Sequence, residues 1–260
     1  MSAAPELRIM NDSGELAHEA AELFGWLGQQ AIASEGSFRV ALSGGSTPET
    51  LYRTLAGAEF AGMLDWGRVR FFFGDERCVP PDHRDSNFAM VHECLLNPLK
   101  IQAERVFRMR GEDSQPERAA REYEDQLRQE FGTPPPAWPR FDLILLGLGE
   151  DGHTASLFPE TQALGERTRL VVANEAPRGV TPRLTLTVPT INHAKAICFL
   201  VTGNSKADMV RTVLEGRDQD TRSVPAKLIK PENGRLIWFM DPAAASELTI
   251  AKQGIVSHEE

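Results

Sequence analysis

Short apolar runs alternate with longer stretches of helical periodicity along most of this 260-residue chain. Apolar residues between Leu16 and Leu27 recur with the spacing of one helix face, which predicts a helix over 14–33. The same patterns predict strands at 7–10, 38–43, 69–73, 106–109, 141–146, 169–173, 184–188, 196–201 and 235–240, and helices near 48–55, 86–96, 116–131 and 205–214, with a short helix after the last strand. Strands that alternate with helices form βαβ units, so we expect a mostly parallel sheet.

One proline-rich stretch, 133–139, is a candidate boundary between domains. Strands of the same buried type flank it, which favours a rigid surface loop over a linker. We therefore expect one α/β domain over residues 1–260, with residues 252–260 as a polar tail. Its architecture should be a Rossmann-like open sheet, mostly parallel and flanked by helices, with room for small insertions.

Composition narrows the classes of function. The net charge of −9 and the lack of a basic stripe argue against a nucleic-acid partner. No secretory signal is visible at the start, and the longest apolar run, near 196–201, is far too short for a membrane span. Three widely spread cysteines without metal-ligand spacing indicate reduced thiols, and we expect a cytoplasmic protein that is a monomer or a small homo-oligomer.

The turn between the second strand and its helix reads SGGSTP, residues 43–48. Gly44 and Gly45 allow close approach of the backbone, and the hydroxyls of Ser46 and Thr47 can donate to an anion together with the first helical N–H groups. Pro48 suits the first helical position, with Thr47 or Ser46 as N-cap. An ordinary capped helix is an equally good interpretation, because the P-loop spacing GxxxxGK[ST] is absent.

The strongest candidate for chemistry follows the strand 141–146, in the segment FDLILLGLGEDGHTASLFP. Its glycine-rich turn carries Glu150, Asp151 and His153. A titratable imidazole beside a carboxylate, at the carboxyl end of a buried strand, lies where open α/β sheets place their chemistry. The turn is therefore a candidate catalytic loop, in which Glu150 is assigned no role.

A second loop, 74–90, follows the strand 69–73 and should lie at the same edge of the sheet. Its Arg77 could stabilise a developing oxyanion or bind a substrate carboxylate, because a guanidinium is always charged and suits planar anions. Alternatively, Asp75, Glu76 and Arg77 form an ion-pair cluster that holds the loop. Both interpretations stay open.

These segments together resemble the 6-phosphogluconolactonases, within the larger family that includes the hexosamine-6-phosphate deaminases. Residues 147–159 match GxGxDGHxASLFP, and residues 75–87 match DERxVPxxHxxSN. In that family, the GGST loop, an arginine before a strand and a lysine before a helix hold the sugar phosphate. The resemblance implies this role for Gly44, Gly45, Ser46, Thr47, Arg183 and Lys206.

The resemblance also implies the activity, which is hydrolysis of 6-phospho-D-glucono-1,5-lactone to 6-phosphogluconate in the oxidative pentose phosphate pathway. His153 would take a proton from the attacking water and return it to the departing ring oxygen. Asp151 is the local carboxylate that could orient the imidazole, and Asp75 is the distant one. No cofactor or metal is expected, because positioning and oxyanion stabilisation can supply the remaining rate gain.

Three other classes of enzyme fit the sequence poorly. The glycines at 147, 149 and 152 satisfy a dinucleotide fingerprint, but Glu150 and Asp151 would repel a pyrophosphate and Pro159 interrupts the required helix. A serine hydrolase needs G-x-S-x-G, and Pro48 replaces the last glycine. The scattered histidines show no metal-ligand spacing.

The closest rival is the amino-sugar-phosphate deaminase/isomerase branch of the same family, whose pattern continues as DGHxxxNEP. This chain has Leu157 at the asparagine position and Phe158 at the acidic position, and phenylalanine cannot assist proton transfer. A non-catalytic phosphosugar-binding regulator would keep the GGST loop and lose the imidazole. This chain has both, which favours the lactonase.

Overall fold

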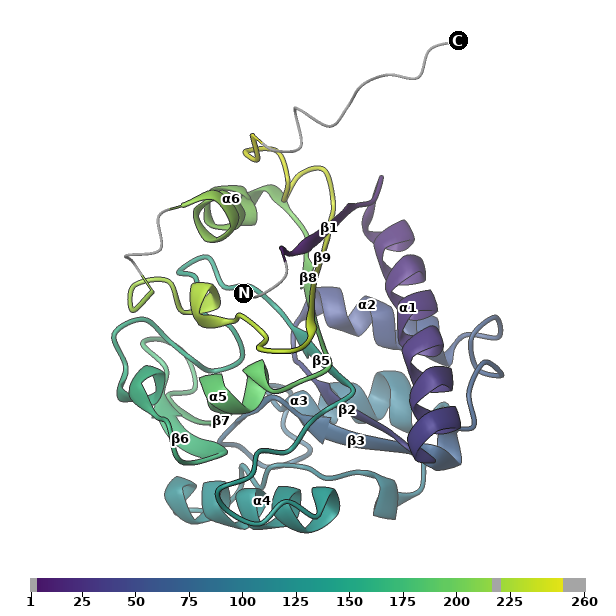
Figure 1. Cartoon of the computed structure of the whole chain (residues 1–260), viewed down its shortest axis with the longest axis vertical. Helices are drawn as coiled ribbons and strands as arrows, with labels where there is room; N and C mark the ends of the chain where they lie inside the picture. The colour runs from purple at the N-terminus through teal and green to yellow at the C-terminus, as the bar shows by residue number, and fades with distance from the viewer. Residues whose placement is uncertain (1–3, 217–220, 250–260) are drawn as a thin grey trace.

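The computed structural model describes residues 4–216 and 221–249, so the predicted tail at 252–260 lies outside the described residues. A six-stranded parallel sheet forms the centre (Figure 1). Its spatial order is β1 (Glu6–Ile9), β9 (Arg235–Met240), β8 (Ala196–Val201), β5 (Leu143–Leu146), β2 (Phe38–Leu42) and β3 (Val69–Phe73). The parallel sheet predicted from the alternation of strands and helices is confirmed.

Helices cover both faces of this sheet. They are α1 (Ser13–Glu35), α2 (Ser46–Ala56), α3 (Asn87–Val91), α4 (Pro116–Phe131), α5 (Val188–Asn192) and α6 (Ala207–Glu215). A π-helical turn at His92–Leu96 continues α3, and single 3₁₀ turns occur at Trp66–Arg68, Ala103–Arg105, Gln162–Gly165, Asn204–Lys206 and Pro225–Leu228. The Asp12 carboxylate caps α1 by accepting from the N–H groups of Gly14 and Glu15, and Gly36 ends this helix with a φ of 77°.

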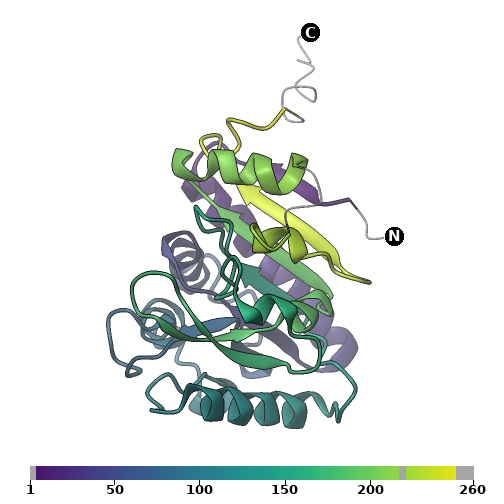
Figure 2. The same cartoon turned by 90° about the vertical axis from the view of Figure 1, so that its left-hand side faces the viewer.

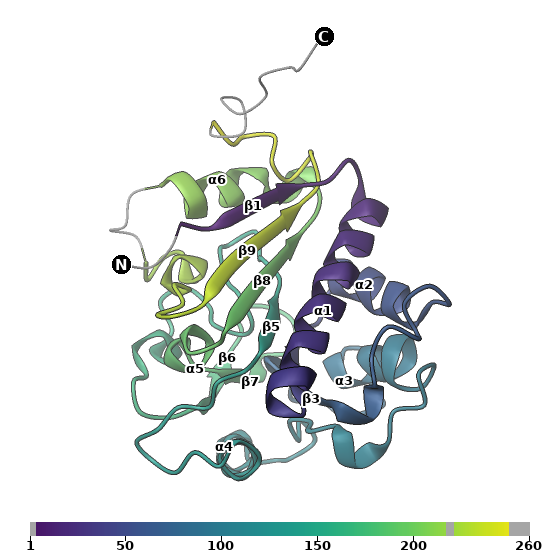
Figure 3. The same ribbon diagram turned by 45° about the vertical axis from the view of Figure 1, so that its right-hand side comes forward.

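Alternation along the strands divides the core between the two faces. In β5, Leu143 and Leu145 pack into a cluster with α1 and α2, whereas Ile144 and Leu146 pack into a second cluster with α4, α5 and α6. Successive side chains of a strand point to opposite faces, so an uninterrupted apolar run is what a strand covered on both sides requires. Figure 3 shows α1 and α2 together on one side of the sheet.

A second, three-stranded sheet contains β4 (Asp75–Arg77), β7 (Pro182–Leu186) and β6 (Val171–Glu175), and its pairs are antiparallel. The predicted strands at 169–173 and 184–188 are thus shifted by two residues and belong to this sheet. Helix α4 packs against β6 and β7, and the three elements lie together at the bottom of Figure 2. The β4 strand lies in a segment that the sequence pattern predicts as a loop.

Three further local predictions are wrong. Residues 106–109 form one bridge, between Val106 and Phe71, and no strand. The Tyr123 hydroxyl inserts there: it accepts from the Phe73 N–H at 2.9 Å and lies 3.2 Å from the carbonyls of Phe73 and Phe107, groups that a longer ladder would need. The segment after β9 forms turns rather than a helix, and the N-cap of α2 is Gly45 rather than a hydroxyl residue. No helix in the described part of the chain is long and apolar enough to cross a membrane.

Candidate active site

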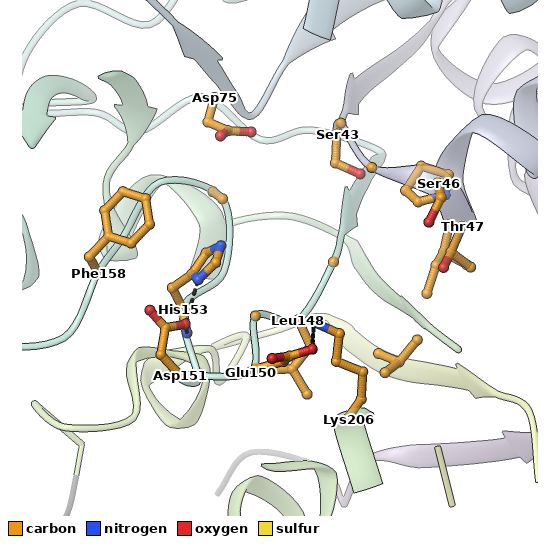
Figure 4. A pocket seen from close by; sticks show the side chains of 18 of the residues that line it. Ser43, Ser46, Thr47, Asp75, Leu148, Glu150, Asp151, His153, Phe158 and Lys206 are labelled. Atoms are coloured by element: carbon orange, nitrogen blue, oxygen red, sulfur yellow. Dashed lines mark hydrogen bonds and ion pairs between the residues drawn. The ribbon is translucent and has the colours of Figure 1, made fainter. Parts of the chain in front are cut away.

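A cavity of about 940 Å³ opens where β8, β5, β2 and β3 end, at the carboxyl edge of the parallel sheet (Figure 4). Ligands bind at this edge in open α/β sheets, because the loops that leave neighbouring strands meet there. The cavity brings together every site residue predicted from the sequence: Gly44, Gly45, Ser46, Thr47, Asp75, Arg77, Asp151, His153, Arg183 and Lys206.

His153 and Asp151 form a close pair in the loop after β5. The Nδ1 atom of His153 lies 2.5 Å from Oδ1 of Asp151, and the same oxygen accepts from the His153 N–H at 3.1 Å. The His153 side chain is 34% exposed and lines the cavity, so one edge of the ring contacts the loop and the rest is open to a ligand. The hydrogen bond from His153 lowers the pKa of Asp151, against the opposing effect of burial. Asp151 is therefore a carboxylate at neutral pH and accepts from a protonated Nδ1.

Gly149 makes this pairing possible. A Cβ atom at this position would lie 2.0 Å from Nδ1 of His153 and 2.6 Å from Oδ1 of Asp151. The turn is closed by backbone bonds, from the Gly149 N–H to the His153 carbonyl and from the Gly152 N–H to the Gly149 carbonyl. Gly152 has a φ of 81°, which other residues rarely adopt. The glycine pattern thus serves the side-chain pair and the turn.

The loop after β2 is fixed by a buried tyrosine. The Tyr52 hydroxyl accepts from the Ser43 N–H and donates to the Ser43 carbonyl. The N-cap of α2 is Gly45, and no side chain of the described residues caps this helix. The amide groups of Ser46 and Thr47 therefore stay available to an anion. The Thr47 hydroxyl also lies 2.8 Å from that of Thr202, which follows β8.

Asp75 and Glu76 occupy a buried hydrogen-bond network in the loop after β3. Asp75 accepts from the Ser156 hydroxyl at 2.6 Å and from the Asn87 amide at 3.2 Å. The Glu76 carboxylate accepts from the backbone N–H groups of Arg77, Asn87 and Phe88 and from the Ser86 hydroxyl. Burial raises the pKa of Glu76 in spite of these donors. No hydrogen bond or ion pair joins Asp75 to His153 among the described residues, so Asp151 is the carboxylate that contacts the imidazole.

Arg77 and Arg183 are neighbours on adjacent strands of the small sheet. They are directly opposite in the β4–β7 register, and both line the cavity. Arg77 donates to the Asp85 carbonyl at 2.7 Å, and its buried Nε has no hydrogen-bond partner among the described residues. Arg183 donates to the Val180 carbonyl at 2.6 Å, and its pKa is lowered by burial and by the charge of Arg77. Two cations held together at a cavity wall favour an anionic ligand.

Lys206 also lines the cavity, in the turn that leads into α6. Its ammonium lies 3.9 Å from a carboxylate oxygen of Glu150, a residue to which the sequence assigns no role. Sequence reasoning also missed the contributions of Ser156, Asn87 and Thr202. Ser156 and Asn87 belong to matched segments, but only three-dimensional contacts show that they hold Asp75. Within the described residues, no group of three or more His, Cys, Asp or Glu side chains is placed to hold a metal ion.

Comparison with known proteins identifies the family. The sequence model described as glucosamine-6-phosphate isomerases/6-phosphogluconolactonase matches residues 11–238. The chain belongs to this family. A 6-phosphogluconolactonase of a Nostoc species is 40% identical over 220 residues, covering 85% of this chain and 88% of that protein. The human 6-phosphogluconolactonase is 37% identical over 247 residues, covering 94% of each. The solved structure of 6-phosphogluconolactonase from Trypanosoma cruzi superimposes with a TM-score of 0.85 at 30% identity, over 96% of this chain and 98% of that one.

Proposed function

We propose that this protein hydrolyses 6-phospho-D-glucono-1,5-lactone to 6-phospho-D-gluconate, a step of the oxidative pentose phosphate pathway. The observation that carries the proposal is that one cavity unites an imidazole–carboxylate pair with an uncapped helix start, two arginines and a lysine. The relatives named 6-phosphogluconolactonase support the choice of substrate. We further propose a cytoplasmic enzyme that works without cofactor or metal, as a monomer or a small homo-oligomer.

His153 is the proposed general base. Because the ionised Asp151 accepts from Nδ1, the proton of a neutral imidazole sits on Nδ1 and the lone pair on Nε2. Nε2 takes a proton from water as the water oxygen bonds to the lactone carbonyl carbon. When the bond from that carbon to the ring oxygen breaks, Nε2 returns the proton to the leaving oxygen. Asp151 stabilises the imidazolium between these two transfers. General acid–base catalysis of this kind contributes about 10²–10⁴-fold.

The phosphate is proposed to bind between the loop after β2 and the cations. Gly44 and Gly45 let the backbone approach it, and Ser46 and Thr47 donate their amide and hydroxyl hydrogens. Arg183 and Lys206 supply positive charge from β7 and from the start of α6. This local charge offsets the global negative charge of the protein, −9, which would otherwise repel a phosphorylated substrate.

Arg77 is proposed to act at the lactone end, where it can stabilise the oxyanion or the product carboxylate. Its guanidinium lines the cavity and makes no ion pair with Asp75 or Glu76 in the described structure. The alternative is a structural role without an ion-pair cluster, in which the Arg77 side chain holds the loop through its hydrogen bond to the Asp85 carbonyl.

The deaminase alternative is opposed by the environment of Phe158. The centre of the Phe158 ring lies 4.8 Å from the centre of the His153 ring and 5.9 Å from the guanidinium carbon of Arg183. An aromatic ring therefore fills the place where the deaminase pattern has its acid, beside the proposed base. A regulator that only binds phosphosugars has no use for a cavity-lining imidazole held by a carboxylate.

The deciding experiment measures lactone hydrolysis with the substrate generated in situ and a metal chelator present. Wild type should act well above the spontaneous rate, and His153→Ala should lose about 10²–10⁴-fold. Amino-sugar phosphates are tested in parallel. Folded wild-type protein that leaves the lactone at its spontaneous rate would disprove the proposal, and activity on an amino sugar would move it to the deaminase branch.

A further inference from the structure

Glu150 forms an ion pair with Lys206, the lysine of the proposed phosphate site. Its Oε1 atom lies 3.9 Å from Nζ of Lys206, and Figure 4 shows the two side chains meeting among the residues that line the cavity. Within residues 4–216 and 221–249, this is the only polar contact of the Lys206 ammonium. The lysine side chain is 25% exposed and the glutamate 67%, so the glutamate is the partner that is freer to move away.

The Glu150 carboxylate has no part in the architecture of its own loop. The turn is closed by the N–H groups of Gly149 and Gly152, and the imidazole is held by Asp151. Neither interaction involves the side chain of Glu150. Glu150 lines the proposed anion site and is paired with one of its cations. We therefore expect this carboxylate to affect ligand binding and not the stability of the fold.

We propose that Glu150 is an internal competitor of the substrate phosphate for Lys206, and so sets the affinity for phosphorylated ligands. The inference rests on the phosphate site proposed above. A phosphate dianion must displace Glu150 from Lys206, and the displaced carboxylate remains close enough to repel it. Ring opening adds a carboxylate to the product, so this repulsion acts more strongly on the product than on the lactone. Glu150 thereby weakens binding and favours product release.

The test is a double-mutant cycle measured by titration calorimetry. Inorganic phosphate and 6-phosphogluconate are titrated into wild type, Glu150→Gln, Lys206→Met and the double variant at low salt. An exposed ion pair contributes roughly 0.2–1 kcal/mol, so Glu150→Gln should bind inorganic phosphate about 1.4- to five-fold more tightly. The gain for 6-phosphogluconate should be at least as large. In the Lys206→Met background the same substitution should lose most of this effect. Kinetics should show a lower KM and no gain in kcat.

Asp208→Asn is the matched control. Asp208 is an exposed acid two residues after Lys206, and its partner is Arg211. The control removes the same charge without freeing Lys206, so it should change affinity less than Glu150→Gln does. Equal gains from the two variants, or an equal gain from Glu150→Gln with and without Lys206, would refute competition. If wild type and Lys206→Met bind phosphate equally weakly, the proposed phosphate site itself is wrong, a result distinct from failure of Glu150 alone.

Discussion

The loop after β5 and the loop after β3 use carboxylates in opposite ways. Asp151 is 43% exposed, touches one imidazole and lines the cavity. Glu76 is 3% exposed, and two backbone or hydroxyl donors serve each of its oxygens. A carboxylate with spare hydrogen-bonding capacity beside a titratable group can assist proton transfer, whereas one whose oxygens are fully occupied holds the backbone. The difference lies in the contacts, since both sequences present acidic residues after a buried strand.

The largest expected effect comes from Asp151→Asn. The amide would present either a donor or a weaker acceptor to Nδ1 and would no longer hold the imidazole proton there. We expect kcat to fall about 10²–10⁴-fold, with little change in Tm because the pair is partly exposed. The measurement is kcat together with thermal unfolding, with Asp208→Asn as the control. A variant that keeps wild-type kcat would remove Asp151 from the mechanism.

The ionisation of Asp151 also makes a prediction about the pH–rate profile. Because its pKa is lowered in the folded protein, the stabilisation from its pairing is complete above the ordinary Asp value of about 4 and is lost as pH falls through the lowered value. Asp151 is thus ionised throughout pH 5–8. Any acidic limb of the kcat/KM profile in that range must come from another group, with an imidazole as the candidate. A limb that persists unchanged in His153→Asn would exclude His153 as its source.

Arg183→Ala tests a residue that lies between the loops after β3 and β5. Arg183 is paired with Arg77 in the small sheet and lies close to Phe158. Removing one partner of a buried charge pair costs about 2–5 kcal/mol, so KM for the phosphorylated lactone should rise by roughly 30-fold or more. Arg211→Ala, which removes an exposed arginine of α6, is the control. An unchanged KM would mean that Arg183 serves the small sheet and not the phosphate.

The contrast between the two sheets shows how far the sequence predicts this structure. The parallel strands appear as continuous apolar runs because both their faces are buried. For Leu143–Leu146, this run alone is enough to predict the strand. The small sheet is different. Its β4 strand is only Asp75–Arg77, a charged tripeptide without apolar periodicity, and β7 supplies the partner that makes it a strand. Pairing between segments about a hundred residues apart leaves no local signal.

The site follows the same rule. The residue types of the GGST and DGH segments predicted an anion site and an imidazole–carboxylate pair, and the structure places them in one cavity. Which carboxylate contacts His153 was open from sequence, because the hydrogen bonds that hold Asp75, from Ser156 and Asn87, depend on the fold. Likewise, the pairing of Glu150 with Lys206 joins two loops that leave adjacent strands.

Glu76→Gln is expected to destabilise the fold without entering the chemistry. The amide would replace one oxygen by a donor, which then faces donors already aimed at that position, and two of them would lose their acceptor. Each unsatisfied buried group costs about 1–3 kcal/mol, and for two such donors we expect a loss of at least about 2 kcal/mol in the free energy of unfolding. The control is Glu49→Gln, a partly exposed residue paired with Arg53. A Tm equal to that of the control would show that the network is not needed.

The smallest expected effect belongs to Ser156→Ala, which cuts the hydrogen bond that joins the two loops. The Ser156 hydroxyl is fully buried and donates to Asp75 at 2.6 Å, while its own N–H faces the Thr185 hydroxyl and would be unaffected. We expect a loss of about 1.5 kcal/mol in unfolding free energy and less than about a ten-fold change in kcat, because Asp75 keeps the Asn87 donor and does not contact His153. Ser246→Ala, at an exposed turn, is the control. A fall in kcat as large as that of Asp151→Asn would erase the distinction between the two loops, since it would make Asp75 part of the chemistry.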